Sequence, residues 1–281
     1  EVGEAIRELR RREYDLVLDI QGNAKSGVVT RLCGAKLRFG FDRAGVREIP
    51  NLLFTNRKVP SRPEDVHVTQ KLLRVASAPF GGEVPSRWSA PTITVPEDAE
   101  RKASRVLEEL RPGASPRLVI HAGTTWNTKR MDPGFWSESA RLLRDRFPRM
   151  GVFLSWGNET EKAEAEEIRR LLGDGACVLP RSTLPELAAM LKVCGHMLGP
   201  DTGPLHIAAA VGAKTVSIFR GSDGNYAAPR GEGHRFLQAP LPCTACQIKG
   251  DRVCERDAEC RRSIPPAAAA SAMSELMEGP R

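Results

Sequence analysis

The segment from Gly199 to Ala210 combines small residues, a carboxylate and an imidazole in an order that suits a phosphorylated ligand. Its sequence is Gly199-Pro-Asp201-Thr202-Gly203-Pro204-Leu-His206-Ile-Ala-Ala-Ala210. Thr202 is suited to be the N-cap of a helix, and Pro204 would lie in the first turn, where a missing N–H costs nothing. The free N–H groups of that turn and the helix dipole would attract a diphosphate. Asp201 could accept sugar hydroxyls, and His206 could face either the phosphates or the core.

A second candidate segment runs from His121 to Trp136, between an apolar strand and an amphipathic helix. It begins with the sequence His121-Ala-Gly-Thr124-Thr125-Trp-Asn-Thr-Lys129. Small and hydroxyl-bearing residues in such a turn let backbone N–H groups and the hydroxyls of Thr124 and Thr125 approach phosphate oxygens. Lys129 adds a mobile positive charge. By itself, this pattern also fits an ordinary loop between a strand and a helix.

A third segment, Ser155-Trp-Gly-Asn-Glu159, also follows an apolar run. A carboxylate just past a strand commonly accepts ribose hydroxyls in nucleotide-binding α/β sheets, which makes Glu159 a candidate. The alternative is that Glu159 only contributes negative charge to the first turn of the helix that it starts, as Glu161 and Glu164 would.

The elements that must position these segments alternate along the chain. Short aliphatic or β-branched runs predict strands at Leu16–Ile20, Arg117–His121, Val152–Ser155, Cys177–Leu179, His196–Leu198 and Thr215–Phe219. Helical patterns lie between them at Gly134–Phe147, Glu159–Leu172, Leu184–Val193 and Leu205–Val211. This order predicts an α/β fold with a parallel sheet that is covered on both faces. Ligands bind to such sheets at the loops that leave the carboxyl ends of the strands.

The length of 281 residues suggests two domains. The Pro- and Ser-rich stretch Pro79–Pro96 is the expected linker. We therefore predict an N-terminal domain with its linker over 1–95, a C-terminal domain over 96–262 and a tail over 263–281. The tail begins with Pro265 and continues as a short helical pattern, and Glu1–Arg12 is typical of a charged helix rather than a signal peptide.

The composition favours a water-exposed globular protein that meets an anion. Hydrophobic residues make up 41% of the chain, and no apolar run approaches the roughly 18 residues that cross a bilayer. The formal net charge of +7 suits an anionic lipid or phosphorylated glycan, or it serves solubility alone. No nucleic-acid-binding signature is present, so we expect no nucleic-acid partner.

Seven cysteines occur, and four of them gather in one polar stretch. Cys33, Cys177 and Cys194 lie in or beside expected elements and are expected to be buried thiols. The cluster consists of Cys243, Cys246, Cys254 and Cys260. Its Cys-x-x-Cys start leaves three alternatives open, namely structural thiols, a zinc or iron–sulfur site, and redox pairing.

Together, the three segments resemble the donor-binding domain of glycosyltransferase family 9, the lipopolysaccharide heptosyltransferases, whose most specific mark is Asp-Thr-Gly-x-x-His-x-Ala-Ala. The run Tyr14–Ser26 resembles that family's strand and Gln-Gly turn. The runs Gly40–Glu48 and Leu53–Lys58 resemble heptosyltransferase I in particular. The resemblance covers about Tyr14–Cys260. It implies a GT-B fold, in which two Rossmann-like domains face each other across a cleft, with the first domain incomplete in this chain.

The resemblance also implies roles for individual residues. The donor contacts that it assigns are Thr124, Thr125 and Lys129 to the diphosphate, Glu159 to the ribose, and Asp201, Thr202, Gly203 and His206 to the sugar-diphosphate. Ser182 stands where heptosyltransferase I has a Met against the adenine, which puts the base contact in doubt. The residues that it places at an anionic acceptor are Gln21, Lys25, Ser26, Arg47 and Arg57.

The chemistry that the resemblance implies is an inverting transfer of heptose from ADP-heptose to the Kdo–lipid A inner core. Lys129 and the helix start near Gly203 would stabilise the leaving diphosphate without a metal, and no Asp-x-Asp motif occurs. The family's base is an Asp in a loop upstream of Glu1, and Asp19 and Asp42 are poor substitutes by position. We therefore expect an N-terminally truncated and nearly inactive chain.

Three other functions remain open at this point. They are a family 9 transferase with another donor or acceptor, a nucleotide-sugar-binding protein without catalysis, and a GT-B nucleotide-sugar epimerase. The resemblance further implies a cytoplasmic location with peripheral contact to the inner membrane, where the glycolipid acceptor lies, and it implies no cofactor.

Overall fold

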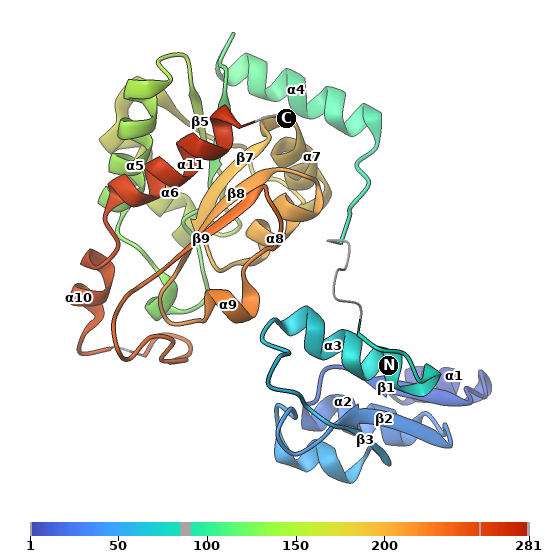
Figure 1. Ribbon diagram of the computed structural model, residues 1–281. Coiled ribbons are helices and arrows are strands. Elements are labelled where there is room, and N and C mark those ends of the chain that lie inside the picture. The colour runs from blue at the N-terminus through green and yellow to red at the C-terminus, as the bar shows by residue number, and fades with distance from the viewer. Residues whose placement is uncertain (1, 85–90, 253, 280–281) are drawn as a thin grey trace. The chain divides into compact units, whose positions relative to one another are not determined.

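The computed structural model describes residues 2–84, 91–252 and 254–279 and contains two compact units (Figure 1). The first unit is Glu1–Trp88 and the second is Ser89–Arg281. The division falls within the stretch 79–96 that we expect to be the linker, of which residues 85–90 lie outside the described residues. No described helix has both the length and the apolar character that a membrane crossing requires.

The first unit is built on a parallel sheet in the order β1-β2-β3. Its strands are β1 (Leu16–Asp19), β2 (Leu37–Phe41) and β3 (Arg57–Val59). Its helices are α1 (Val2–Arg11), α2 (Ala24–Leu32) and α3 (Val68–Ser77), with 3₁₀ turns η1 (Ile49–Leu53) and η2 (Ala78–Phe80). Helix α1 confirms the expected charged helix at the N-terminus. Helix α2 begins where it does because Asn23 and Ser26 form a capping box, in which each side chain accepts from the other's backbone N–H.

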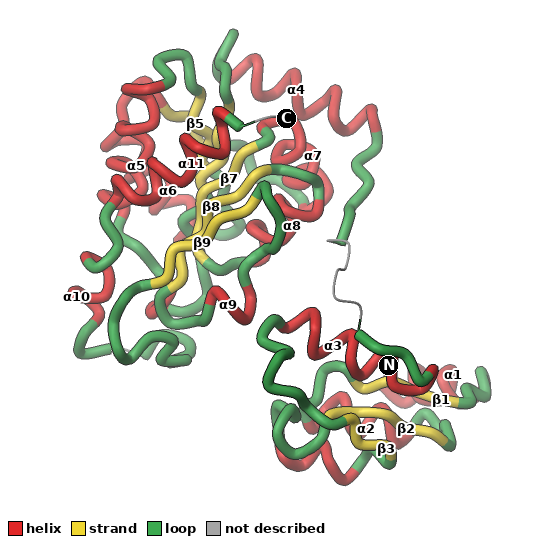
Figure 2. Tube along the Cα trace, in the orientation of Figure 1, coloured by secondary structure: helices red, strands yellow, loops and turns green. Residues whose placement is uncertain are grey.

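The second unit is built on a six-stranded parallel sheet in the order β6-β5-β4-β7-β8-β9. Figure 2 shows its strands β7, β8 and β9 side by side. Its strands are β4 (Arg117–Ile120), β5 (Gly151–Leu154), β6 (Ala176–Val178), β7 (His196–Pro200), β8 (Lys214–Phe219) and β9 (His234–Gln238). The predicted parallel sheet is therefore confirmed, with strand bounds that differ by a few residues.

Helices cover both faces of this sheet, because successive strand residues point to opposite sides. Leu118 and Ile120 of β4 pack in one core cluster, whereas Val119 packs in the other. The first cluster includes residues of α5 (Pro133–Arg146), α6 (Glu159–Leu172) and α11 (Pro266–Glu278). The second includes residues of α4 (Glu97–Leu110), α7 (Leu184–Cys194) and α8 (Gly203–Ala210). Shorter elements are η3 (Asn127–Lys129), η4 (Gly173–Gly175), α9 (Gly224–Ala227) and α10 (Asp257–Arg262).

Within the segment 263–281, which we expect to be a tail, helix α11 packs on the rest of the second unit. Met273 and Leu276 are buried in the first core cluster, and Lys214 of β8 donates to the carbonyl oxygens of Leu276 and Gly279 at the end of the helix. The alanine run Ala267–Ala270 allows this close approach because its side chains are small. Helix α11 is therefore part of the packed structure of the second unit.

Candidate functional site

The strand order of the second sheet reverses between β4 and β7. Strand β4 pairs with β5 on one side and with β7 on the other. In open α/β sheets, ligands bind outside the carboxyl ends of the strands at such a switch point. The loop after β4 carries Thr124 and Lys129, and the loop after β7 carries Asp201. The fold thus brings together the two segments that the sequence singles out for phosphate and sugar binding.

Lys129 and Asp201 form an ion pair at this switch point. Lys129 Nζ lies 2.6 Å from Asp201 Oδ2, and each side chain is only 12% exposed. Burial raises the pKa of Asp201, but the contacts with His206 and Lys129 outweigh burial and hold that pKa well below its usual value. Lys129 Nζ also lies 4.1 Å from the centre of the Trp126 ring, a cation–π contact.

Helix α8 presents its first turn beside this pair. Thr202 is its N-cap, as predicted, but the Thr202 hydroxyl does not cap the helix, and Pro204 lies in the first turn. His206 Nε2 lies 3.7 Å from Asp201 Oδ1 and the His206 side chain is 49% exposed, so this residue faces the site rather than the core. Gly203 is exposed. The first turn therefore offers uncapped N–H groups and a positive dipole end to an anion.

The two threonines after β4 differ in exposure. Thr124 is buried, and its hydroxyl donates to the carbonyl oxygen of Asp201 over 3.5 Å, so it joins the two loops. Thr125 is exposed. A ligand at the switch point would therefore reach the Thr125 hydroxyl without displacing an internal hydrogen bond.

The carboxylate that faces the loop after β4 is that of Glu161 rather than Glu159. Glu159 is the first residue of α6 and is exposed, as its alternative interpretation as a first-turn charge requires. The Glu161 side chain is 15% exposed, and its Oε2 accepts the N–H of Gly157 over 2.8 Å. It also packs on Gly123, where an added Cβ would come within 2.4 Å of Glu161 Cδ. Sequence reasoning missed Glu161 as a site residue.

The position of Glu161 follows from the start of its helix. The Asn158 side chain accepts the N–H of Glu161 over 3.0 Å, so Asn158 is the N-cap and Glu161 is the third helical residue. A carboxylate at that position can reach back toward the residues before the helix. The Asn-x-x-Glu spacing was the signal in the sequence that could have identified Glu161.

His121 directly follows β4 and is buried beside the loops of the site. Its side chain is buried, its Nδ1 lies 3.1 Å from Ser155 Oγ, and its Nε2 lies 3.9 Å from Glu161 Oε2. Burial lowers the pKa of His121, and the nearby Glu161 carboxylate only partly opposes that change. His121 is therefore neutral at pH 7 and links the ends of β4 and β5.

Ser182 lies in the loop between β6 and α7. Its hydroxyl donates to the carbonyl oxygen of Pro180 over 2.9 Å and lies 3.9 Å from the sulfur of Met190. The side chain is partly exposed. The Ser182 hydroxyl is therefore already bonded within its own loop. Any contact of Ser182 with a nucleobase would be made by this short side chain, next to Met190.

In the first unit, some candidate acceptor residues are hydrogen-bonded within the unit, and the others are exposed on its surface. Ser26 is held inside the unit because its hydroxyl donates to the Asp19 carboxylate over 2.8 Å, and Asn51 donates to the other carboxylate oxygen over 2.6 Å. The backbone N–H of Gln21 also donates to Asp19. Asp19 is thus a buried acceptor that fixes the turn after β1.

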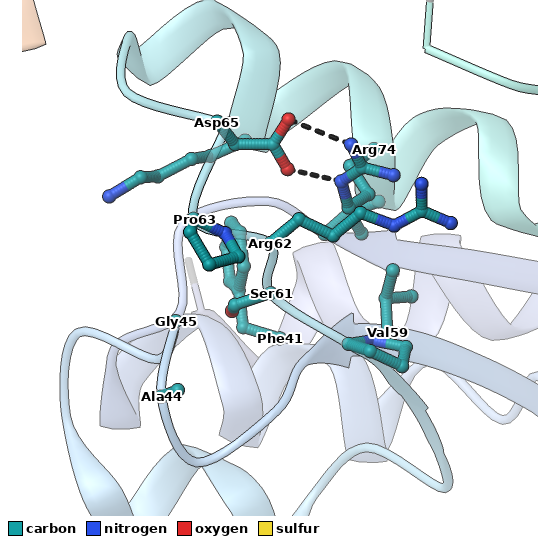
Figure 3. Close-up of a pocket in the computed structure, with 12 residues that line it drawn as sticks. Phe41, Ala44, Gly45, Val59, Ser61, Arg62, Pro63, Asp65 and Arg74 are labelled. Atoms are coloured by element: carbon teal, nitrogen blue, oxygen red, sulfur yellow. Dashed lines mark hydrogen bonds and ion pairs between the residues drawn. The ribbon is translucent and has the colours of Figure 1, made fainter.

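The remaining candidates in the first unit lie on its surface. The exposed candidates are Gln21, Lys25, Arg47 and Arg57. The same unit contains a cavity of about 330 Å³ between apolar side chains and the cations Arg62, Lys71 and Arg74 (Figure 3). Arg74 is paired there with Asp65, with Nη2 at 2.8 Å from Oδ1.

The cysteine cluster lines one small cavity in the second unit. Cys243, Cys246, Cys254 and Cys260 meet there beside Arg220 and Arg256. Within 2–84, 91–252 and 254–279, no group of three or more potential ligands is arranged to hold a metal ion. Of the scattered cysteines, Cys33 and Cys194 are buried as expected, whereas Cys177 at the edge strand β6 is only partly buried.

The switch point brings together a buried lysine–carboxylate pair and the uncapped first turn of α8, and comparison with known proteins identifies the family. Residues 2–255 match the family described as glycosyltransferase family 9 (heptosyltransferase). The chain belongs to glycosyltransferase family 9. This match covers both units, so the resemblance expected from the sequence motifs is confirmed.

Two curated relatives of this family 9 chain are both named lipopolysaccharide heptosyltransferase 1. That of Pseudomonas aeruginosa is 30% identical over 241 residues, which are 86% of this chain and 64% of the relative. That of Campylobacter coli is 26% identical over 220 residues, which are 75% of this chain and 63% of the relative. The chain therefore spans slightly less than two thirds of the length of these two relatives.

A solved structure shows the same fold. The E. coli heptosyltransferase WaaC with ADP is 21% identical to this family 9 chain and has a TM-score of 0.70, over 98% of this chain and 78% of that one. The likeness confirms the predicted GT-B fold class with Rossmann-like α/β domains.

Proposed function

We propose that this chain binds ADP-heptose at the switch point of its second unit and belongs to a transferase that adds heptose to the Kdo–lipid A inner core of lipopolysaccharide. The observation that carries the proposal is the Lys129–Asp201 ion pair at 2.6 Å beside the uncapped first turn of α8. The family match and the relatives named as lipopolysaccharide heptosyltransferases support it. The likeness to a heptosyltransferase solved with ADP supports the choice of nucleotide.

The proposed reaction is a direct displacement that inverts the anomeric carbon of the donor. The acceptor hydroxyl gives its proton to a general base of the whole transferase, and its oxygen forms the new bond to C1 of heptose. The bond from C1 to the diphosphate oxygen breaks, and ADP leaves with the electron pair. Lys129 and the first turn of α8 stabilise the negative charge on the leaving diphosphate, so that no metal is required. Because its pKa is held low, Asp201 stays ionised and acts as an acceptor for sugar hydroxyls rather than as an acid.

Around this pair, we propose the remaining donor contacts. The hydroxyls of Thr124, Thr125 and Thr202, the N–H of Gly203 and the imidazole of His206 would contact the sugar-diphosphate. Glu161 would accept the ribose hydroxyls in place of Glu159, because its carboxylate faces the loop after β4 and Glu159 faces solvent. This proposal replaces Glu159 by Glu161 but keeps a carboxylate as the acceptor of the ribose hydroxyls, as the sequence indicates.

The acceptor is proposed to be an anionic glycolipid that meets the first unit. Its exposed candidates Lys25, Arg47 and Arg57, with Gln21, offer positive charge and hydrogen bonds. The formal net charge of +7 also favours an anionic partner. Such an acceptor would bring the protein to the cytoplasmic face of the inner membrane as a peripheral contact.

The first test is calorimetric titration of the chain with ADP and with ADP-heptose, beside an Asp201→Asn variant. We expect the unchanged chain to bind both ligands and to bind ADP-heptose more tightly. In the variant, the additional affinity for the sugar should be lost, whereas ADP binding through Lys129 and α8 remains. Glu278→Gln, which likewise replaces a carboxylate with an amide but at an exposed position on α11, is the matched control. A chain that binds neither ligand would contradict the proposal.

A second candidate is a family 9 transferase with a different donor, and Ser182 is the observation that favours it. The short Ser182 side chain is bonded within its own loop and offers little surface to a nucleobase. Titration with GDP and UDP beside ADP distinguishes the two. A preference for another base would replace the proposed donor without changing the assignment of the diphosphate site.

A further inference from the structure

The cysteine-bearing loop between β9 and α10 is fastened to the loop that carries Lys129. Asn127 donates its backbone N–H to the carbonyl oxygen of Gly250 over 3.0 Å and its side chain to that of Asp251 over 3.1 Å. The hydroxyl of Thr128 donates to the carbonyl oxygen of Ile248 over 2.7 Å. These three bonds surround Lys249. The backbone on both sides of this lysine is therefore fixed relative to the donor loop.

Lys249 shares an aromatic ring with Lys129. Lys249 Nζ lies 5.9 Å from the centre of the Trp126 ring, and Lys129 Nζ lies 4.1 Å from the same point. The two ammonium groups are therefore no more than about 10 Å apart, which is about one Debye length at 0.1 M salt, so the charge of each is not fully screened from the other. Two cations at one indole repel each other, and an anion between them would relieve that repulsion.

The charge of Lys129 is already partly balanced, whereas that of Lys249 is not. Lys129 is 2.6 Å from Asp201 Oδ2, so it shares its charge with that carboxylate. Lys249 is exposed, and within the described part of the chain it forms no ion pair. A nucleoside diphosphate brings more than one negative charge, so a single lysine that shares its charge with a carboxylate neutralises it incompletely.

We propose that Lys249 is a second diphosphate-binding residue, which extends over the switch-point site from the cysteine-bearing loop and contacts the same nucleoside diphosphate as Lys129. This inference rests on the proposed function, since it places a further cation at that donor site. It also gives the cysteine-bearing loop a role, because the loop positions Lys249 through its bonds to Asn127 and Thr128.

The experiment compares Lys249→Ala and Lys249→Arg with Arg252→Ala, which removes an exposed cation from the same loop. Calorimetric titration with ADP and with adenosine measures the contribution of the phosphates. We expect Lys249→Ala to weaken ADP binding by about tenfold and adenosine binding by less than about twofold. Lys249→Arg should keep ADP affinity within about threefold of the unchanged chain, because the charge remains. Arg252→Ala should bind ADP as the unchanged chain does.

The outcomes separate this inference from the function on which it rests. If the unchanged chain binds ADP and Lys249→Ala binds it equally well, Lys249 is not a phosphate ligand, and the switch-point site stands without it. An equal loss of ADP and adenosine affinity in both Lys249 variants would show that the residue only supports the loop, and it would overturn the inference. Failure of the unchanged chain to bind ADP would overturn both the inference and the proposed function.

Discussion

Lys129 Nζ lies 2.6 Å from Asp201 Oδ2, although the two residues are 72 positions apart in the sequence. The contact joins the loop after β4 to the loop after β7, which are neighbours only because the strand order reverses between those strands. Both side chains are largely shielded from water, so the loss of either charge leaves the other poorly compensated. The pair is therefore both part of the site and part of what holds the site together.

The Asp201→Asn variant should lower the free energy of unfolding by about 2 kcal/mol at pH 7, because Lys129 would lose its ionised partner in a partly buried position. The pKa of Asp201 is lower in the folded than in the unfolded chain, so its contribution is complete above the unfolded pKa of about 3.9 and is lost as the pH falls. Urea unfolding of the unchanged chain and of Asp201→Asn at pH 7, 5 and 3.5 measures this. The difference between their free energies of unfolding should become smaller only at pH 3.5.

An exposed ion pair serves as the control for that measurement. Arg146 and Glu278 are 2.6 Å apart, but their side chains are 60% and 44% exposed. Glu278→Gln should change the free energy of unfolding by less than about 0.5 kcal/mol. Equal losses in the two variants would mean that the Lys129–Asp201 pair has no special protection from solvent.

Glu161→Gln should weaken ADP binding by about tenfold, whereas Glu159→Gln should change it by less than about twofold. The reason is orientation, since only the Glu161 carboxylate lies against Gly123 in the loop after β4. The two variants remove the same charge from the same turn of α6, so each controls for the other in calorimetric titration. A larger loss in Glu159→Gln would restore the residue that the sequence motif indicates.

The choice between these two glutamates shows where sequence reasoning ends. The apolar run at β5 and the acidic helix after it were both predictable, and α6 has the predicted bounds. Which carboxylate turns inward depends on the N-cap, because a shift of one or two residues rotates each side chain by 100° or more around the helix. Asn158 lies within the segment Ser155–Glu159, but only the structure shows its side chain accepting the N–H of Glu161 and so setting the start of the helix.

Strands were predictable where they are central and apolar. Strands β4 (Arg-Leu-Val-Ile) and β5 (Gly-Val-Phe-Leu) are mostly apolar because both of their faces are buried, and β8 is buried over Thr215–Phe219. By contrast, β2 (Leu-Arg-Phe-Gly-Phe) and β9 (His-Arg-Phe-Leu-Gln) carry charged residues, and neither was predicted. Strand β9 lies at the edge of its sheet, where side chains that reach solvent are tolerated.

The turn after β1 also contains contacts that the sequence does not predict. Ser26 is a candidate acceptor residue by motif, yet its hydroxyl is bonded to Asp19, which also accepts from Asn51, 32 residues further along the chain. No local pattern links Asn51 to this turn. Hydrogen bonds between distant segments therefore decide which motif residues are engaged within the first unit.

Replacement of His121 by Gln should make the unfolding free energy less dependent on pH below about pH 6.5. Burial lowers the pKa of His121 in the folded chain, so the unfolded chain binds more protons as the pH falls below the unfolded pKa. The unchanged protein should thus lose stability by up to about 1.4 kcal/mol per pH unit from this residue.

The measurement for His121 is urea unfolding at half-unit steps from pH 7.5 to 5. His196 and His234 also have lowered pKa values because of burial, so the variant should keep part of the slope. Identical slopes for the variant and the unchanged protein would show that His121 is protonated as readily when folded as when unfolded. That result would contradict its buried contact with Ser155 and Glu161.

Met273→Ala in helix α11 should lower the free energy of unfolding of the second unit by about 3 kcal/mol, because it removes a fully buried side chain from the core between α5 and the sheet. Trp136, which is buried in the same cluster, reports the unfolding by its fluorescence. The exposed Ser271→Ala change in the same helix should cost less than about 0.5 kcal/mol. If Met273→Ala is as stable as the Ser271 variant, the segment 263–281 is a detachable tail rather than a part of the second unit.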